Sequence, residues 1–381
     1  MSGPDDATTG AARWASESSQ LLSRTKRSGL SGWIADLDPG YFACVMASGI
    51  ISVGADLLHQ QLLSRITLVA TVAAFVILAF AYVARAVAFR DEMRHSLGDP
   101  KTAMGYFTVA AGTNVLAARL LMSGHPLLTL ILGGAAGALW LILSYGLPWS
   151  IMFAARRPVL GDINGTWLIW VVATQSVSIV AAGLAANSPW NFLHADLSIV
   201  AVVCWGAGIM LYLTLSVIIF LRLFLVDITP NEMGPAYWIV MGATAISVRA
   251  AAGILAIHDR VAAGLLATMH PILVGFSVIL WSFGTWWIPL LVLFGVWRHL
   301  LRHYPLDYEP RLWSVVFPLG MYTVASITLG QTSGLSFMSS VAHLWLWVGV
   351  VAWAATSLLL VDELARIRFK RRRLSKASTP S

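Results

Sequence analysis

An aromatic residue and a hydroxyl residue recur at a fixed spacing in four apolar stretches of this chain. Each copy has Tyr or Trp, then five residues, then Ala or Gly followed by Ser or Thr. The pairs are Tyr41 with Ser48, Tyr106 with Thr113, Trp167 with Thr174, and Tyr237 with Thr244. Seven residues are close to two turns of an α-helix, so the two side chains share one helix face. Hydroxyl dipoles repeated on several helices are suited to holding an anion weakly along a permeation path.

A fifth apolar stretch begins the same way at Trp313 but has Leu319 and Gly320 in place of the small residue and the hydroxyl. The five starts are separated by 65, 61, 70 and 76 residues. Each interval is long enough for two membrane-spanning helices and their loops. The repeat therefore predicts five helical hairpins.

The composition independently predicts a membrane protein that crosses the bilayer many times. Apolar residues make up 58% of the chain and charged residues 11%, which is outside the range of ordinary soluble domains. We expect an all-α membrane protein with ten transmembrane helices, arranged as five hairpins with quasi-fivefold symmetry around a central pore. The expected spans are 39–58, 65–86, 102–122, 126–147, 166–186, 196–221, 235–256, 270–297, 312–330 and 341–361.

Lysine and arginine positions predict the orientation. Of the 25 such residues, 20 fall in the two tails and the loops on one side, two on the other side, and three within spans. The positive-inside rule then places both termini in the cytoplasm. We expect a disordered tail over 1–36, a transport domain over 37–362 and a basic tail over 363–381. The net charge of +7 reports this topology, so it implies no nucleic-acid partner; membrane lipid is the expected neighbour.

The odd-numbered spans are the more polar ones, so we expect them to be inside and to form the wall of the pore. Ser48, Thr113, Asn114, Thr174 and Thr244 are the candidate pore-lining residues. The alternative for each hydroxyl is a packing contact between helices, which is common in membrane proteins.

Two arginines are expected near the outer ends of inner helices. Arg119 and Arg249 are candidates for a positive outer vestibule that concentrates anions. The alternatives are snorkelling to lipid headgroups or pairing with Asp56. The middle of the spans holds no Asp, Glu, Lys or His, which disfavours a transporter driven by an intramembrane carboxylate.

Phe317 and Pro318 form the main irregularity in the ninth span. Proline lacks an N–H, so it frees the carbonyl of Ser314 and kinks the helix. A large aromatic side chain at the kink is a candidate plug for the pore, and ordinary packing beside the kink is the alternative.

The sequence contains no motif that predicts an enzyme. It has no phosphate-binding loop, no paired-histidine metal motif and no nucleophile signature. Both cysteines, Cys44 and Cys204, fall within spans, so we expect no disulfide, no metal site and no cofactor.

Two segments resemble a known family. Residues 37–50, LDPGYFACVMASGI, resemble the first-helix signature of the tellurite-resistance/C4-dicarboxylate transporter family, which includes plant slow anion channels and yeast malate and sulfite transporters. Residues 313–319, WSVVFPL, resemble that family's ninth helix. The resemblance implies a pore of five odd-numbered helices surrounded by five even-numbered ones, assembly as a homotrimer, and a pore occluded by Phe317.

The leading hypothesis is therefore gated conduction of small inorganic or organic anions across the plasma membrane, with Phe317 and Pro318 at the gate. The second hypothesis is a secondary transporter or exporter of a C4-dicarboxylate, sulfite or a tellurite-type oxyanion. The sequence does not identify the anion.

Overall fold

The computed structural model describes residues 30–153, 158–258 and 262–377. Within these residues every regular element is a helix. Nine helices in the described part of the chain are long and apolar enough to cross a membrane. The prediction of an all-α membrane protein is confirmed at this level.

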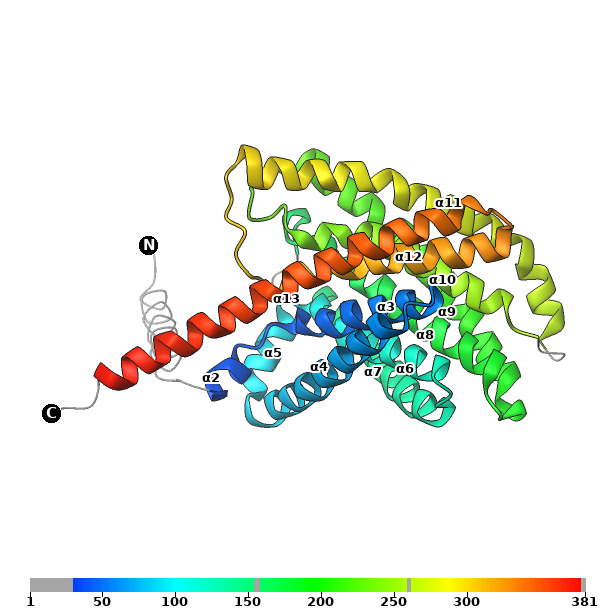
Figure 1. Cartoon of the computed structure of the whole chain (residues 1–381), viewed down its shortest axis with the longest axis horizontal. Helices are drawn as coiled ribbons and strands as arrows, with labels where there is room; N and C mark the ends of the chain where they lie inside the picture. Colours follow the sequence, from blue (N-terminus) through cyan, green and yellow to red (C-terminus); the bar gives the residue numbers. More distant parts are fainter. Residues whose placement is uncertain (1–29, 154–157, 259–261, 378–381) are drawn as a thin grey trace, which may run out of the picture.

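The long helices form two sets (Figure 1). The inner helices are α3 (Ala43–Leu57), α6 (Phe107–Met122), α8 (Ile169–Asn187), α10 (Ile239–Leu255) and α12 (Trp313–Ser333). The outer helices are α4 (Gln61–Ala88), α7 (Pro126–Met152), α9 (Asn191–Leu225), α11 (Ala263–Val296) and α13 (Phe337–Ala377). Two short helices, α2 (Leu30–Ala35) and α5 (Arg90–Gly98), lie outside both sets.

Packing distinguishes the two sets. Each inner helix contacts two other inner helices, in the closed order α3, α6, α8, α10, α12 and back to α3. Each inner helix also packs against the outer helix that follows it in the chain. At least 72% of the most apolar stretch is buried in α3, α8, α10 and α12, against at most 39% in the outer helices. The polar odd-numbered spans are therefore enclosed, and the outer helices carry the exposed apolar surface.

Every inner helix begins with a short 3-10 turn. The turns are Pro39–Phe42, Ala103–Tyr106, Gly165–Leu168, Pro235–Trp238 and Pro310–Leu312. In the first of them Asp38 Oδ1 accepts a hydrogen bond of 2.7 Å from the Gly40 N–H, which satisfies a donor that the helix start leaves free.

The small residue of the repeat allows close packing of the inner helices. A Cβ at Gly112 would lie 3.1 Å from the Phe42 ring. Ala47 and Ala173, at the same repeat position as Gly112, are fully buried. Gly320 takes the hydroxyl position in the fifth copy, and a Cβ there would lie 2.7 Å from Ile50. Small residues let neighbouring backbones approach, as is usual at helix interfaces in membranes.

The helix boundaries differ from the sequence prediction in three places. The predicted span 102–122 is helical as α6 with its preceding turn, but it is not among the nine apolar helices. Part of the tail predicted to be disordered forms α2; residues 1–29 lie outside the described residues. The outer helices run past the predicted ends, and α13 continues to Ala377, so it extends beyond the bundle (Figure 1).

Candidate functional site

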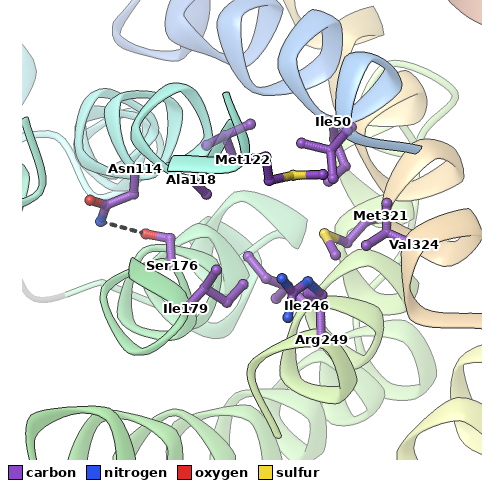
Figure 2. A pocket seen from close by; sticks show the side chains of 12 residues that line it. Ile50, Asn114, Ala118, Met122, Ser176, Ile179, Ile246, Arg249, Met321 and Val324 are labelled. Carbon is purple, nitrogen blue, oxygen red and sulfur yellow. Dashed lines mark hydrogen bonds between the residues drawn. The ribbon is translucent and has the colours of Figure 1, made fainter. Parts of the chain in front are cut away.

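A small cavity lies among the five inner helices (Figure 2). Its volume is about 40 Å³, enough for a few water molecules or one small ion. Every inner helix contributes to the wall, which consists of Ile50, Val53, Asn114, Val115, Ala118, Met122, Ser176, Ile179, Ile246, Arg249, Met321 and Val324. The cavity therefore lies within the ring that these helices form.

Two neutral polar side chains on this wall are bonded to each other. Asn114 Nδ2 donates to Ser176 Oγ at 2.9 Å, and the Ser176 hydroxyl donates to the Ala173 carbonyl at 2.7 Å (Figure 2). The hydrogen bond joins α6 to α8 and fixes the position of both side chains. Asn114 is the only one of the five predicted pore-lining residues that lies on the cavity wall.

Arg249 brings a positive charge to the cavity. Its side chain projects from α10 beside Ile246 (Figure 2). Among the described residues its guanidinium makes no hydrogen bond and no ion pair, and Gly253 lies next to it on the same helix. An unpaired charge in a largely apolar enclosure is costly, so it attracts a counter-ion.

Arg119 is in a different environment. Its Nη2 forms an ion pair with Asp56 Oδ1 at 3.0 Å, and the guanidinium also donates to Ser52, Ser64 and Ser123. The structure therefore matches the alternative of pairing with Asp56, and of the two arginines only Arg249 lines the cavity.

Two of the repeated hydroxyls accept hydrogen bonds from outer helices. Ser48 Oγ accepts from the Trp353 indole N–H of α13 at 2.9 Å, and Thr174 Oγ1 accepts from the Trp140 indole N–H of α7 at 2.9 Å. Both hydroxyls therefore make a packing contact between helices, which was the alternative to a position on the pore wall. Neither lines the cavity.

The other two repeated hydroxyls bond within their own helices. The Thr113 hydroxyl donates to the Val109 carbonyl and the Thr244 hydroxyl to the Met241 carbonyl, both at 2.7 Å. Thr244 also packs against Gly284 of α11, where an added Cβ would overlap its hydroxyl. Neither residue lines the cavity.

Phe317 lies on α12 between Met321, which lines this cavity, and Ser314, which lines a second small pocket. That pocket, of about 30 Å³, is lined by Arg311 and Ser314 at the start of α12 and by residues at the starts of α3, α6 and α8. Met321 lines the central cavity. Ser314, Phe317 and Met321 are spaced by three and four residues and so share one face of α12. Phe317 is fully buried between them.

Pro318 is held by a neighbouring inner helix. A Cβ at Gly242 of α10 would lie 2.8 Å from Pro318 Cγ. The close contact between α10 and α12 therefore falls at the residue that follows Phe317.

Two buried arginines at the opposite end of the fold bond to inner-helix starts. Arg85 donates to the Leu37 carbonyl at 2.6 Å and to the Tyr106 hydroxyl at 3.1 Å. Arg222 donates to the Tyr237 hydroxyl. Both tyrosines are aromatic residues of the repeat, so these arginines tie outer helices to the starts of inner helices.

Comparison with known proteins decides the family. Residues 36–361 match the model of the SLAC1 family, described as voltage-dependent anion channel. The chain belongs to this family. The resemblance drawn from residues 37–50 and 313–319 is confirmed, and membership supports anion transport across the membrane.

Several known proteins are similar in sequence to this chain. A Mycobacterium tuberculosis protein, uncharacterized membrane protein Rv1735c, is 37% identical over 155 residues, which are 41% of this chain and 77% of the relative. Uncharacterized transporter MJ0576 of Methanocaldococcus jannaschii is 27% identical, over 85% of this chain and 92% of its own length. The sulfite efflux pump SSU1 of Arthroderma benhamiae is 23% identical, over 86% and 92%. These names indicate a transporter or channel.

Proposed function

We propose that the protein is a channel that conducts small anions across the plasma membrane along the axis of the inner helices. The observation that carries the proposal is the Arg249 guanidinium, which has no hydrogen-bond or ion-pair partner among the described residues and lines a cavity to which all five inner helices contribute. A fixed positive charge raises the local concentration of anions and repels cations. Because the rest of the cavity wall is uncharged, an anion held there is held weakly enough to leave, which conduction requires.

The architecture that we propose around this site has ten spans, counting α6. The inner helices form the pore wall and the outer helices a surrounding layer, as five hairpins with quasi-fivefold symmetry. The closed order of contacts among the inner helices supports this arrangement. The distribution of Lys and Arg supports cytoplasmic termini, and the family resemblance supports a homotrimer.

We propose Phe317 as the gate. It is buried, and it shares a face of α12 with Ser314 and Met321, which line the two pockets. In this proposal its side chain closes the path between them. Rotation of the ring or a shift of α12 at Pro318 would join the pockets. We place Asn114 and Ser176 on the pore wall beyond the gate.

A second candidate function is export of sulfite or another oxyanion by a secondary transporter. The similarity to proteins named sulfite efflux pump favours it. A coupled transporter needs a group that exchanges the driving ion, and saturable flux that depends on a pH gradient would distinguish it from a channel.

The test is anion flux from purified protein in liposomes, with chloride, nitrate and malate gradients at fixed and varied pH. A channel gives non-saturating chloride or nitrate flux, which Phe317→Ala increases severalfold. Phe107→Ala is the matched control, because Phe107 is equally buried on an inner helix but stacks on Trp170. Absence of anion flux from both the folded wild type and folded Phe317→Ala would refute the proposal, and a folded Phe317→Ala with no more flux than a conducting wild type would refute the gate.

A further inference from the structure

A larger crevice lies on the outside of the fold, between the C-terminal end of α11 and the middle of α13. Its volume is about 280 Å³. Leu291 and Phe294 of α11 form one wall, and Ala355 and Leu359 of α13 form the other. The turn before α10 and the start of α12 close it from behind. The crevice shares no lining residue with the central cavity.

The crevice is apolar along most of its length and basic at one end. Arg298 and His299 line that end, and no Asp or Glu is among the described residues that line the crevice. An apolar slot that ends in a cation matches a molecule with an apolar chain and an anionic head.

The Arg298 guanidinium has hydrogen-bonding capacity left for such a head. It is 4% exposed, its Nη2 donates to Glu309 Oε1 at 3.2 Å, and it stacks on the Tyr304 ring. Its Nε is buried without a partner among the described residues. Its Nη1 lies 3.7 Å from the position of a Cβ at Gly234, which lines the crevice. Glu309 thus occupies Nη2, the Nε is buried out of reach, and Nη1 is the donor that lies next to the Gly234 wall of the crevice.

The size and position of the crevice narrow the class of ligand. A volume of 280 Å³ is just below the range of about 300–1,000 Å³ for small-molecule sites, so it suits part of one acyl chain rather than a whole nucleotide. Arg298 and Arg302 fall on the side of the chain that is rich in Lys and Arg, where the anionic lipids of the cytoplasmic leaflet are found.

We propose that the crevice binds one anionic phospholipid, with an acyl chain between α11 and α13 and the phosphate on Arg298. The proposal rests on the orientation inferred from the charges and is independent of the pore. Leu312 and Val315 form part of the crevice. Val315 and Phe317 are two residues apart and point to nearly opposite sides of α12. The lipid therefore packs on the back of the helix that carries Phe317.

The test is native mass spectrometry of the purified full-length protein, titrated in detergent with phosphatidylglycerol or phosphatidylcholine. We expect the wild type to retain one phosphatidylglycerol per protomer and to retain phosphatidylcholine much less. Arg298→Gln should lose this preference, whereas Arg302→Gln, which removes an exposed cation from the same loop, should keep it. Ala355→Trp fills the crevice without touching the charge and should also abolish retention.

Two results would overturn the proposal. One is equal retention of the two lipids by the wild type. The other is undiminished phosphatidylglycerol retention in Ala355→Trp, which remains decisive if Arg298→Gln does not fold. If Ala355→Trp instead changes the number of protomers in the particle and leaves lipid retention intact, the crevice is a contact between copies of the chain and not a lipid site.

Discussion

Arg119 of α6 and Asp56 of α3 form an ion pair, with Nη2 and Oδ1 3.0 Å apart. The Arg119 side chain is 6% exposed and the Asp56 side chain 24%. Ser52 and Ser64 donate to each other's backbone carbonyls, at 2.8 and 2.9 Å, and also accept from Arg119. The cluster fastens α3, α4 and α6 together near the ends of the helices.

Asp56→Asn should destabilise the protein, because it leaves a buried guanidinium without its counter-charge. Removing one partner of a buried pair costs about 3–5 kcal/mol, and partial exposure of Asp56 favours the lower end. The measurement is the melting temperature in detergent. Asp196→Asn, at an exposed carboxylate on the same side of the fold, is the control and should have little effect. Equal melting temperatures for both variants would show that Arg119 finds sufficient compensation in the serines.

Arg249→Gln should weaken anion uptake, because it removes the unpaired charge from the cavity. Two unit charges about 4 Å apart attract by about 1–4 kcal/mol between bulk-water and protein-surface dielectric constants, so anion flux at low anion concentration should fall roughly fivefold or more. Liposome flux measured over a range of nitrate and chloride concentrations gives this value.

Arg249→Lys separates charge from geometry. Lysine keeps the charge but lacks the planar fork that binds two oxygens at once. If the fork contacts the anion, nitrate flux should fall more than chloride flux. Arg65→Gln, at an exposed arginine on α4, is the control. Flux of Arg249→Gln equal to that of this control would exclude Arg249 from the path.

The sequence was sufficient to predict whether most helices are inner or outer ones. It was not sufficient to predict which neighbour each side chain contacts. Polar residues concentrate in the spans that the structure buries. The sequence reveals these spans because hydropathy is averaged over a whole span. The spacing of an aromatic residue and a hydroxyl shows that they share a helix face, but not which neighbour that face meets. Thr174 and Ser176 are about 200° apart around α8; the first meets α7 and the second the cavity.

Long-range pairing was also beyond the sequence. Asp56 and Arg119 are 63 residues apart, and only the packing of α3 on α6 decides that they meet. Nothing in the local sequence around Arg119 and Arg249 separates the paired arginine from the unpaired one. The helix α6 is short and carries the polar residues Asn114 and Arg119. Its mean hydropathy is therefore too low for it to count among the nine apolar helices.

Ser48→Ala should lower stability and leave anion flux unchanged. The substitution leaves the Trp353 indole N–H without its acceptor, at a cost of about 1–3 kcal/mol. Melting temperature and liposome flux are measured together. Asn114→Ala is the comparison, because its side chain lines the cavity, and it should change flux. If Ser48→Ala changed flux as much as Asn114→Ala does, the Ser48 hydroxyl would have to line the pore.

Gly242→Ala tests whether the contact between α10 and α12 positions the gate. The added Cβ would lie 2.8 Å from Pro318 Cγ and 3.1 Å from Pro318 Cβ. A proline ring cannot rotate away, so α12 must shift at the residue that follows Phe317. Such overpacking costs about 1–3 kcal/mol, and the shift should raise anion flux if Phe317 closes the path.

The control for this substitution is Gly206→Ala on α9, where an added Cβ meets nothing within 4 Å. Alanine is favoured over glycine in a helix interior by about 1 kcal/mol, so this variant should melt at the same temperature as the wild type or higher, with normal flux. Raised flux in Gly242→Ala but not in Gly206→Ala would show that the contact between α10 and α12 positions the gate. A destabilised Gly242→Ala with normal flux would mean that Phe317 keeps its position when α12 moves, and the gate would then depend on rotation of the ring rather than on the helix.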